Sequence, residues 1–382
     1  MFLSLFDKTR YSGGDFASFN DLHLMDTPKV SELTYTKKWS NIGDFTAVFP
    51  YDREILQALK INGFLHCMGE WFWTQSISYD GTKITVKGTD SKGLLGTRLA
   101  LWYDDDEQEA GTEGYDVVGG NPPRNTAYCI KHYLDNNCID PSDVSRRLPI
   151  VWVGGANGIG NDHYMAKYQY ISEIVNELCD GAEIGYEMTA DGGAARKFSF
   201  KTLAGVDRSF GQNTNPRVIF SLKHRNLVSQ SFEHGVDNLY NVIYATTADN
   251  VEYIAQRDNP TNGHRYINRR ETHVSVSINS TDSDIMQYKY KYAIEQVKDN
   301  VETHSYVISP SQTSGFGTEY DLGDTVSIID DYTGDRYDAK ITEYTRSIRQ
   351  GEDKVTIVLG KQKQKPLEKI VNGFLSGTQR RL

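Results

Sequence analysis

The sequence is poor in cysteine, in proline and in long apolar runs, and each shortage excludes a class of protein. Its 382 residues include 4 Cys and 10 Pro. The cysteines form no CxxC pair, so we expect reduced core thiols and neither a disulfide framework nor a zinc ribbon. No window approaches the roughly 18 uninterrupted apolar residues of a membrane span, and the apolar start, residues 1–6, is too short for a signal peptide. We therefore predict no membrane insertion, and a strand at residues 1–6.

Basic charge is also scarce. Lys and Arg number 41 against 51 Asp and Glu, which gives a net charge of −10. That sign disfavours a protein whose task is to hold phosphate backbones. The deficit is uneven, because residues 361–382 carry six Lys or Arg and one Glu, a charge of +5, and residues 1–360 therefore carry −15.

Motifs of catalysis and metal binding are missing as well. The sequence has no HExxH, no GxSxG and no His/Cys pair at metal-ligand spacing. Residues 154–160 are glycine-rich and follow an apolar run, but they fit neither the P-loop nor GxGxxG, so we expect a flexible or assembly-facing loop. The acidic run 104–109 lacks the ligand spacing of an EF-hand, and we expect a solvated loop. We predict no enzyme activity, no catalytic residue, no cofactor and no metal.

What the sequence does contain is strand periodicity. Residues 31–39 alternate, residues 45–49 form an apolar run, and Asp80-Gly81 supplies a tight hairpin turn between two further runs. Asp52 can cap a short helix whose apolar residues share one face. Runs at this spacing favour a barrel or sandwich.

Between residues 111 and 190 the apolar residues recur at the spacing of helices instead of that of strands. Asn125 can cap a helix that ends near residue 136, and an apolar stripe predicts a longer helix over 163–179, ended by Gly181. The apolar strand 150–153 lies between them. This region is therefore a small α/β insertion in a β-rich chain. From residue 198 strands return, and the segment 284–300 has helical spacing, although 288–292 could equally alternate as a strand.

The predicted fold class is α+β, mainly β, with several small β-barrel or sandwich domains. The domains we expect are a β-barrel-like domain over 1–110 completed by 191–235, the α/β insertion over 111–190, a second β domain with a helix over 236–300, a C-terminal β domain over 301–360 and a basic amphipathic helix over 361–382.

The C-terminal helix supplies the candidate docking residues. Pro366 suits a first helical position, and an apolar stripe follows it. The stripe consists of Leu367, Ile370, Val371, Phe374 and Leu375. The stripe could pack on its own chain or on a partner, and we favour a partner subunit over a membrane surface because the charges flank the helix instead of lining it.

Several segments, in this order, carry a resemblance to a known family. They are Leu33-Thr-Tyr-Thr-Lys-Lys-Trp39, Gly43-Asp-Phe-Thr-Ala-Val-Phe-Pro50, Val86-Lys-Gly88, Lys92-Gly-Leu-Leu95, Arg217-Val-Ile-Phe220, Asn226-Leu227, Asn238-Leu-Tyr-Asn-Val-Ile-Tyr244, Tyr320-Asp-Leu-Gly-Asp-Thr-Val326, Asp338-Ala-Lys-Ile-Thr-Glu343 and Lys354-Val-Thr-Ile-Val-Leu-Gly360. Their order and spacing resemble the baseplate hub, or tail-associated protein, of long-tailed siphovirus-type bacteriophages, which is related to the trimeric hub of contractile phage baseplates.

The resemblance implies a structural virion protein with a phage tail hub-like fold. It implies a homotrimer that joins the hexameric tail tube and distal tail protein ring to the tail tip. The partners it implies also include the fibre or receptor-binding proteins, with the tape measure protein as a further candidate. It also implies a DNA-ejection channel through which DNA passes without specific binding, and assembly in the host cytoplasm before incorporation at the tail tip. Many family members continue into a lytic or fibre domain, and the end at Leu382 leads us to expect any lytic activity on another polypeptide.

Two other functions compete with the hub. The first is a cell-wall (peptidoglycan) hydrolase or peptidase that uses carboxylates or the histidines of the 111–190 insertion. The second is a carbohydrate-binding receptor module, for which 24 Tyr and 5 Trp offer stacking surfaces, although strand positions make a core the simpler account.

Overall fold

The computed structural model describes residues 2–7, 23–101, 116–158, 160–166, 168–190, 197–237, 239–247, 252–256, 266–276, 303–311, 315–349 and 351–360, together with Ala293, Val297 and Asn300. The chain divides into two compact units, which are described separately. Unit 1 comprises residues 1–230 and 307–359, and unit 2 comprises residues 231–306 and 360–382.

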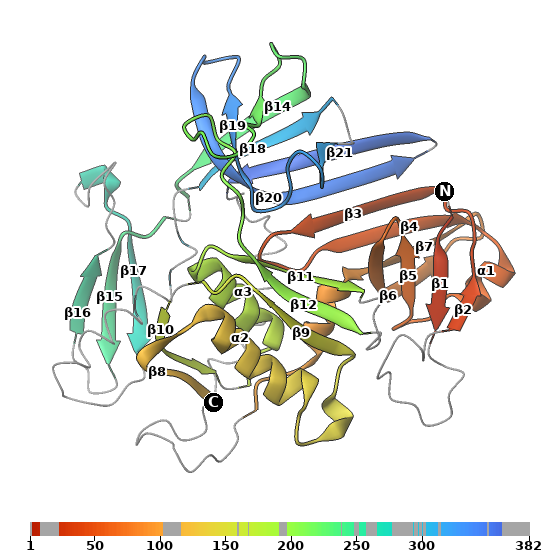
Figure 1. Ribbon diagram of the computed structural model, residues 1–382, viewed down its shortest axis with the longest axis horizontal. Coiled ribbons are helices and arrows are strands. Elements are labelled where there is room, and N and C mark those ends of the chain that lie inside the picture. Colours follow the sequence, from red (N-terminus) through yellow and green to blue (C-terminus); the bar gives the residue numbers. More distant parts are fainter. Residues whose placement is uncertain are drawn as a thin grey trace. The chain divides into compact units, whose positions relative to one another are not determined.

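The largest element of the fold is a mixed sheet of 13 strands, and Figure 1 shows its long strands. Along the sheet the neighbours are β14 (Leu227–Gly235), β18 (Thr303–Pro310), β21 (Glu352–Gly360), β20 (Arg336–Arg349), β3 (Glu32–Lys38), β4 (Asp44–Pro50), β7 (Lys83–Asp90), β6 (Glu70–Tyr79), β5 (Phe64–Cys67), β1 (Ser4–Asp7) and β2 (His23–Asp26). Beside this path, β19 (Thr325–Ile329) pairs with β20 and with the two-residue β13 (Ile219–Phe220).

Strands from the two ends of the sequence are neighbours in this sheet. β3 pairs antiparallel with β20, so that Tyr35 faces Arg346 across the ladder. The alternation predicted for residues 31–39 explains the pairing, because Leu33 and Tyr35 are buried while Thr34 lies on the other face and contacts Ser347, with their hydroxyl oxygens 3.0 Å apart. The predicted domains 1–110 and 301–360 therefore contribute adjacent strands to one sheet.

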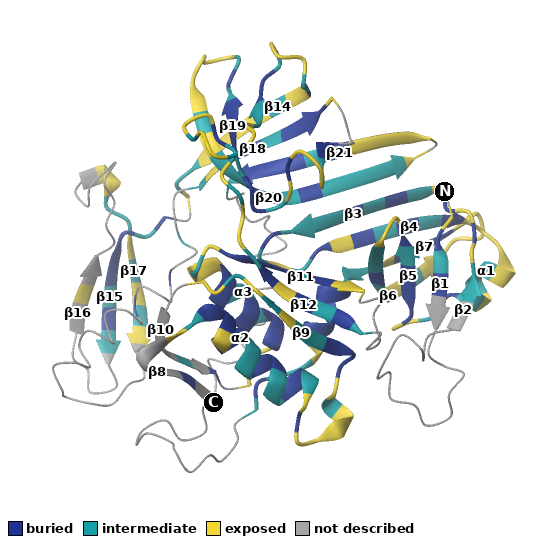
Figure 2. Cartoon of the chain, in the orientation of Figure 1, coloured by how far each residue is buried: buried dark blue, intermediate teal, exposed yellow. Residues whose placement is uncertain are grey.

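The α/β insertion has its own sheet and core within unit 1. Its three strands are ordered β11 (Gly185–Ala190), β12 (Phe198–Leu203) and β9 (Ile150–Gly155), with β9 and β12 parallel. Two helices pack against this sheet, α2 (Thr126–Leu134) and α3 (Ile171–Gly181), and Figure 2 shows how much of both is buried. Helix α2 begins where predicted, since the Asn125 side chain accepts a hydrogen bond from the amide of Tyr128.

The predicted helix over 163–179 is wrong in its first half. Residues Gly160–Ala166 form β10, which pairs antiparallel with β8 (Asp116–Asn125), and the helix begins at Ile171. Tyr164 and Tyr168 fit the predicted helical stripe, but residues four apart also share one face of a strand, so their spacing fits both structures. Tyr168, at a positive φ of 53°, separates the two elements.

Shorter elements complete unit 1. They are helix α1 (Arg53–Ala58), the 3-10 helices η2 (Ser91–Thr97) and η4 (Val144–Arg146) and the π-helical turn η3 (Asp135–Ile139). Helix α1 and the hairpin of β6 and β7 confirm the expectations from Asp52 and Asp80-Gly81, because Asp52 caps α1 and the hairpin turns at 80–82.

In unit 2, β15 (Val242–Thr247) is the middle strand of a small sheet. It pairs antiparallel with β16 (Glu252–Gln256) and parallel with β17 (Glu271–Val276), which follows the 3-10 helix η5 (Tyr266–Asn268). Ile243 and Ala245 form its core with Ala293 and Val297. The rest of the helix predicted over 284–300 lies outside the described residues, as does the C-terminal helix predicted over 361–382.

The predicted fold class is confirmed as mainly β with an α/β insertion. Among the described residues the large sheet runs from β14 to β2 and does not close into a barrel. Strand β12 lies beyond the insertion boundary predicted at residue 190. No helix in the described ranges has the length and apolar character to cross a membrane. All four cysteines are buried thiols that form no disulfide, and burial raises the pKa of Cys129 to about 11.

Candidate functional site

Segments far apart in the sequence meet around Trp39, at the end of β3. The Trp39 amide donates a hydrogen bond to the carbonyl of Thr342 in β20 over 2.9 Å, and its carbonyl accepts one from the amide of Tyr186 in β11 over 3.2 Å. The residue is 5% exposed. Trp39 thus joins the N-terminal strands, the C-terminal strands and the α/β insertion, and we call Trp39, Lys92, Asp90, Tyr186 and Gly323 the junction.

Glycine is required where the chain before β19 passes the indole. Gly323 has a φ of 85°, and a Cβ atom on it would lie 2.3 Å from the Trp39 ring. Both the backbone conformation and the contact therefore exclude a side chain. This close contact with the indole explains why the Gly-Asp pair of segment 320–326 begins with a glycine.

Lys92, in η2, places an ammonium group inside the protein. The residue is 5% exposed, and its Nζ donates to the carbonyl of Lys38 over 2.7 Å and to the carbonyl of Asn41. It also lies 3.6 Å from Asp90 Oδ2 and 4.9 Å from the centre of the Tyr186 ring. A buried charge is tolerated when it is paired and hydrogen-bonded, and here the last residue of β3 and the loop after it provide the two acceptor carbonyls.

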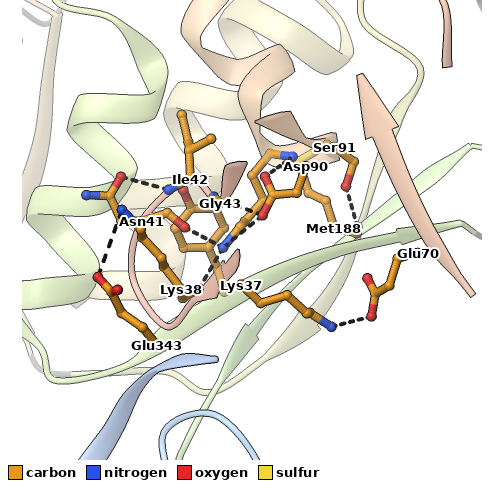
Figure 3. A network of polar contacts seen from close by, with 12 residues as sticks. Lys37, Lys38, Asn41, Ile42, Gly43, Glu70, Asp90, Ser91, Met188 and Glu343 are labelled. Atoms are coloured by element: carbon orange, nitrogen blue, oxygen red, sulfur yellow. Dashed lines mark hydrogen bonds and ion pairs between the residues drawn. The ribbon is translucent and has the colours of Figure 1, made fainter. Parts of the chain in front are cut away.

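Asp90 holds the other side of this arrangement. Its carboxylate accepts hydrogen bonds from the amide of Lys92 over 3.1 Å, which caps η2, and from the amide of Gly43 over 3.0 Å (Figure 3). Burial raises the pKa of Asp90 and lowers the pKa of Lys92, while the attraction between the two charges opposes both shifts. The pair therefore depends on its hydrogen bonds as much as on its charges.

Neighbouring polar groups extend the contact between sheet and insertion. Ser91 Oγ donates to the carbonyl of Met188 over 2.6 Å, and the Tyr186 hydroxyl donates to Asn176 over 2.8 Å. The ion pair of Lys37 with Glu70, 2.7 Å long (Figure 3), has both side chains 30% exposed and contributes less to stability.

A second buried carboxylate fixes the chain that returns from the insertion. Asp324, which is 4% exposed, accepts hydrogen bonds from the amide of Val206 over 2.9 Å, from Arg208 Nε over 2.8 Å and from the amide of Asp321 over 3.0 Å. The connector after β12 is thereby tied to the start of β19. Asp324 is the second residue of the Gly-Asp pair, so both members have a defined structural task.

The junction has a structural role. The Lys92 ammonium is buried among carbonyl oxygens, so it cannot reach a substrate. In the described ranges no three His, Cys, Asp or Glu side chains gather in a way that could hold a metal ion. What the arrangement achieves is a fixed orientation of the insertion on the sheet within unit 1.

The sites considered in the sequence fall in different places. The docking candidates Leu367, Ile370, Val371, Phe374 and Leu375 lie outside the described residues, and so does the acidic run 104–109. The described part of the glycine-rich loop, 154–158, is tied to its neighbours.

That loop packs on β12 and on the start of α2. The amide of Ala156 donates to the carbonyl of Thr202 over 3.0 Å, and the carbonyl of Asn157 accepts a hydrogen bond of the same length from the amide of Ala127. Gly155 has a φ of 132°, and a Cβ atom there would lie 2.0 Å from the Thr202 carbonyl oxygen. Its glycine content therefore serves close packing, and the flexible or assembly-facing character that we expected of the loop stays a prediction.

Comparisons with known proteins agree with this architecture. The family model described as Siphovirus ReqiPepy6 Gp37-like protein matches residues 17–361. No curated protein sequence matches the chain.

Three solved structures share the fold over almost their whole length. The prophage MuSo2 43 kDa tail protein from Shewanella oneidensis is 10% identical, with 94% of this chain and 97% of that chain covered and a TM-score of 0.52. The prophage tail protein gp18 from Listeria monocytogenes EGD-e is 12% identical, with 100% of both chains covered and a TM-score of 0.52. The tail protein from Neisseria meningitidis MC58 is 12% identical, with coverage of 94% and 96% and a TM-score of 0.55.

The first prediction concerns the contact of Gly323 with Trp39. The substitution Gly323→Ala should lower the free energy of unfolding by about 2–4 kcal/mol, because it adds overlap with the indole to the strain of a positive φ. Gly334 is a matched control, since its φ is 82° and a Cβ atom on it would have no neighbour within 4 Å. Gly334→Ala should cost about 1 kcal/mol. Urea unfolding measures both, and equal losses would show that the indole contact is unimportant.

The second prediction concerns the buried ammonium. Lys92→Met keeps the volume of the side chain but leaves Asp90 without its cation, so we expect a loss of about 3–5 kcal/mol in the free energy of unfolding. Lys87→Met is the control, because Lys87 is exposed on β7 and should change stability by less than about 0.5 kcal/mol. Similar urea midpoints for the two variants would contradict the role assigned to Lys92.

Proposed function

The chain belongs to the Siphovirus ReqiPepy6 Gp37-like protein family, and we propose that it is the trimeric baseplate hub of a bacteriophage tail. The observation that carries the proposal is the extent of the likeness. The family model spans residues 17–361, and three tail proteins of known structure share the fold over at least 94% of this chain. Such coverage assigns the sheet and the insertion together to a tail architecture.

The construction of unit 1 suits a load-bearing role. A hub holds the tail tube and the tail tip in fixed geometry, so its parts must not move against each other. Trp39 and Lys92 join the sheet to the insertion through buried contacts, and Asp324 fixes the returning chain. Packed interiors transmit strain instead of absorbing it, which favours such a function.

The charge distribution suits a DNA conduit. Residues 1–360 carry −15, and an acidic lumen repels phosphates weakly instead of adsorbing them. DNA would then pass during ejection without being held. The acidic side chains of the assembled ring should face the channel.

The partners follow from this position in the virion. They are two further copies of the chain, the distal tail protein ring on one side and the tail tip with its fibre or receptor-binding proteins on the other. The tape measure protein is a further candidate partner. The protein would be assembled in the host cytoplasm, would remain at the tail tip of the virion and would act without catalysis.

The trimer is open to direct measurement. We expect the purified chain to have a mass of about 130 kDa by light scattering, three times its 43.2 kDa, and to form a threefold ring with a central hole in electron micrographs. A monomer would contradict the hub, and a ring whose lumen is lined by Lys and Arg would contradict the conduit.

The C-terminal segment provides a second measurement. Deletion of residues 362–382 should leave the trimer intact but abolish recruitment of the tail tip, because the apolar stripe is removed. The double substitution Leu367→Asp with Phe374→Asp should have the same effect on co-purification of the tip proteins. Lys363→Gln, outside the stripe, is the control and should retain recruitment. Normal tip assembly by the deletion variant would refute the docking role.

A further inference from the structure

A hollow with no assigned role lies between the segment that follows η2 and the 3-10 helix η4. Its volume is about 320 Å³. It is lined by Thr97, Arg98, Leu99, Leu101, Ser145 and Arg146. This size lies at the lower end of the range for small-ligand sites. The lining combines two cationic side chains with two leucines.

The two guanidinium groups are held in place by backbone oxygens. Arg98 Nε donates to the carbonyl of Arg146 over 2.6 Å, and Arg146 Nη2 donates in return to the carbonyl of Leu99. Asn137 Oδ1 accepts from Arg146 Nη1 over 3.2 Å and from the amide of Leu101 over 3.1 Å. These bonds fix both side chains before any ligand arrives, so little rotamer entropy remains to be lost on binding.

Among the described residues, several arginines of unit 1 are ion-paired, and Arg98 is not. Arg208 pairs with Asp324, Arg346 with Asp353 and Arg147 with Asp140. Arg98 forms no ion pair with any described residue, and its Nη1 donates to the carbonyl and hydroxyl oxygens of Thr97. Burial lowers the pKa of Arg98, and the nearby Arg146 cation acts in the same direction. A half-buried cation next to a like charge is stabilised by an anion.

We propose that this hollow binds a carboxylate presented by another protein. Arg98 Nη2 forms no hydrogen bond within the described structure, so it can donate a charge-assisted hydrogen bond to a carboxylate oxygen while Nε and Nη1 hold the side chain in place. Leu99 and Leu101 give the methylene groups of an acidic side chain an apolar wall. The net charge of −10 disfavours the alternative, a nucleic-acid phosphate, because a polyanion would be repelled by the whole chain.

The proposal goes beyond the hub function and does not depend on the trimer. The test is calorimetric titration of the full chain with glutarate, and separately with inorganic phosphate, at constant ionic strength. We expect saturable binding of glutarate, weakened at least about tenfold by Arg98→Gln. Arg147→Gln is the matched control, because Arg147 is next to Arg146 in sequence but does not line the hollow. It should bind glutarate as the wild type does.

Arg98→Lys guards against a folding defect. It keeps the charge without the guanidinium fork, so its affinity should lie between those of the wild type and Arg98→Gln, and thermal melts should show that each variant is folded. Three results would overturn the proposal: absence of saturable glutarate binding, binding unchanged by Arg98→Gln, or phosphate bound at least as tightly as glutarate. A fourth result comes from substituting the carboxylates of the acidic run 104–109 with their amides. If it raises glutarate affinity about tenfold, the hollow serves the chain's own carboxylates and not those of a partner.

Discussion

A buried ammonium group must be surrounded by oxygen atoms, and this requirement determines how the parts of unit 1 fit together. The oxygens around Lys92 come from the last residue of β3, from the loop after it and from Asp90, while the ring of Tyr186 in the insertion covers the cation. Removal of any part would leave polar groups unpaired in an apolar setting, which is costly. The Trp39 indole packs against Gly323 and brings the C-terminal strands to the same end of β3. Sheet, insertion and C-terminal strands therefore share one set of contacts.

A tail protein benefits from such a construction. The likeness to tail proteins of known structure extends over the whole architecture although identity is 10–12%. At 10–12% identity few side chains are shared. The fold therefore has to be specified by patterns of burial and by a small number of positions that accept only one type of residue. In this chain those positions are glycines that permit close approach and buried charges that need defined partners.

Local structure could be predicted from the sequence where it is determined by hydrogen bonds and turns between residues close together in the chain. Asn125 and Asp52 cap the helices that were expected of them, and Asp80-Gly81 turns the predicted hairpin. The predicted helix over 163–179 failed at its start because the four-residue spacing of Tyr164 and Tyr168 fits a strand as well as a helix. Residues 160–166 form a strand because they pair with β8. The junction was not predicted, since Lys92 meets Asn41 across 51 residues and no local pattern records such a contact. A lysine directly after a capping Asp-Ser pair and before Gly-Leu-Leu was its one visible sign.

The central claim is that three copies of this chain form a ring at the end of a phage tail. Cryo-electron microscopy of the intact tail tests it most directly, because position, copy number and channel are seen together. The account predicts density for three copies between the tube and the tip, around a central channel lined by acidic side chains. Density for this fold elsewhere in the virion, or a number of copies incompatible with threefold symmetry, would contradict it.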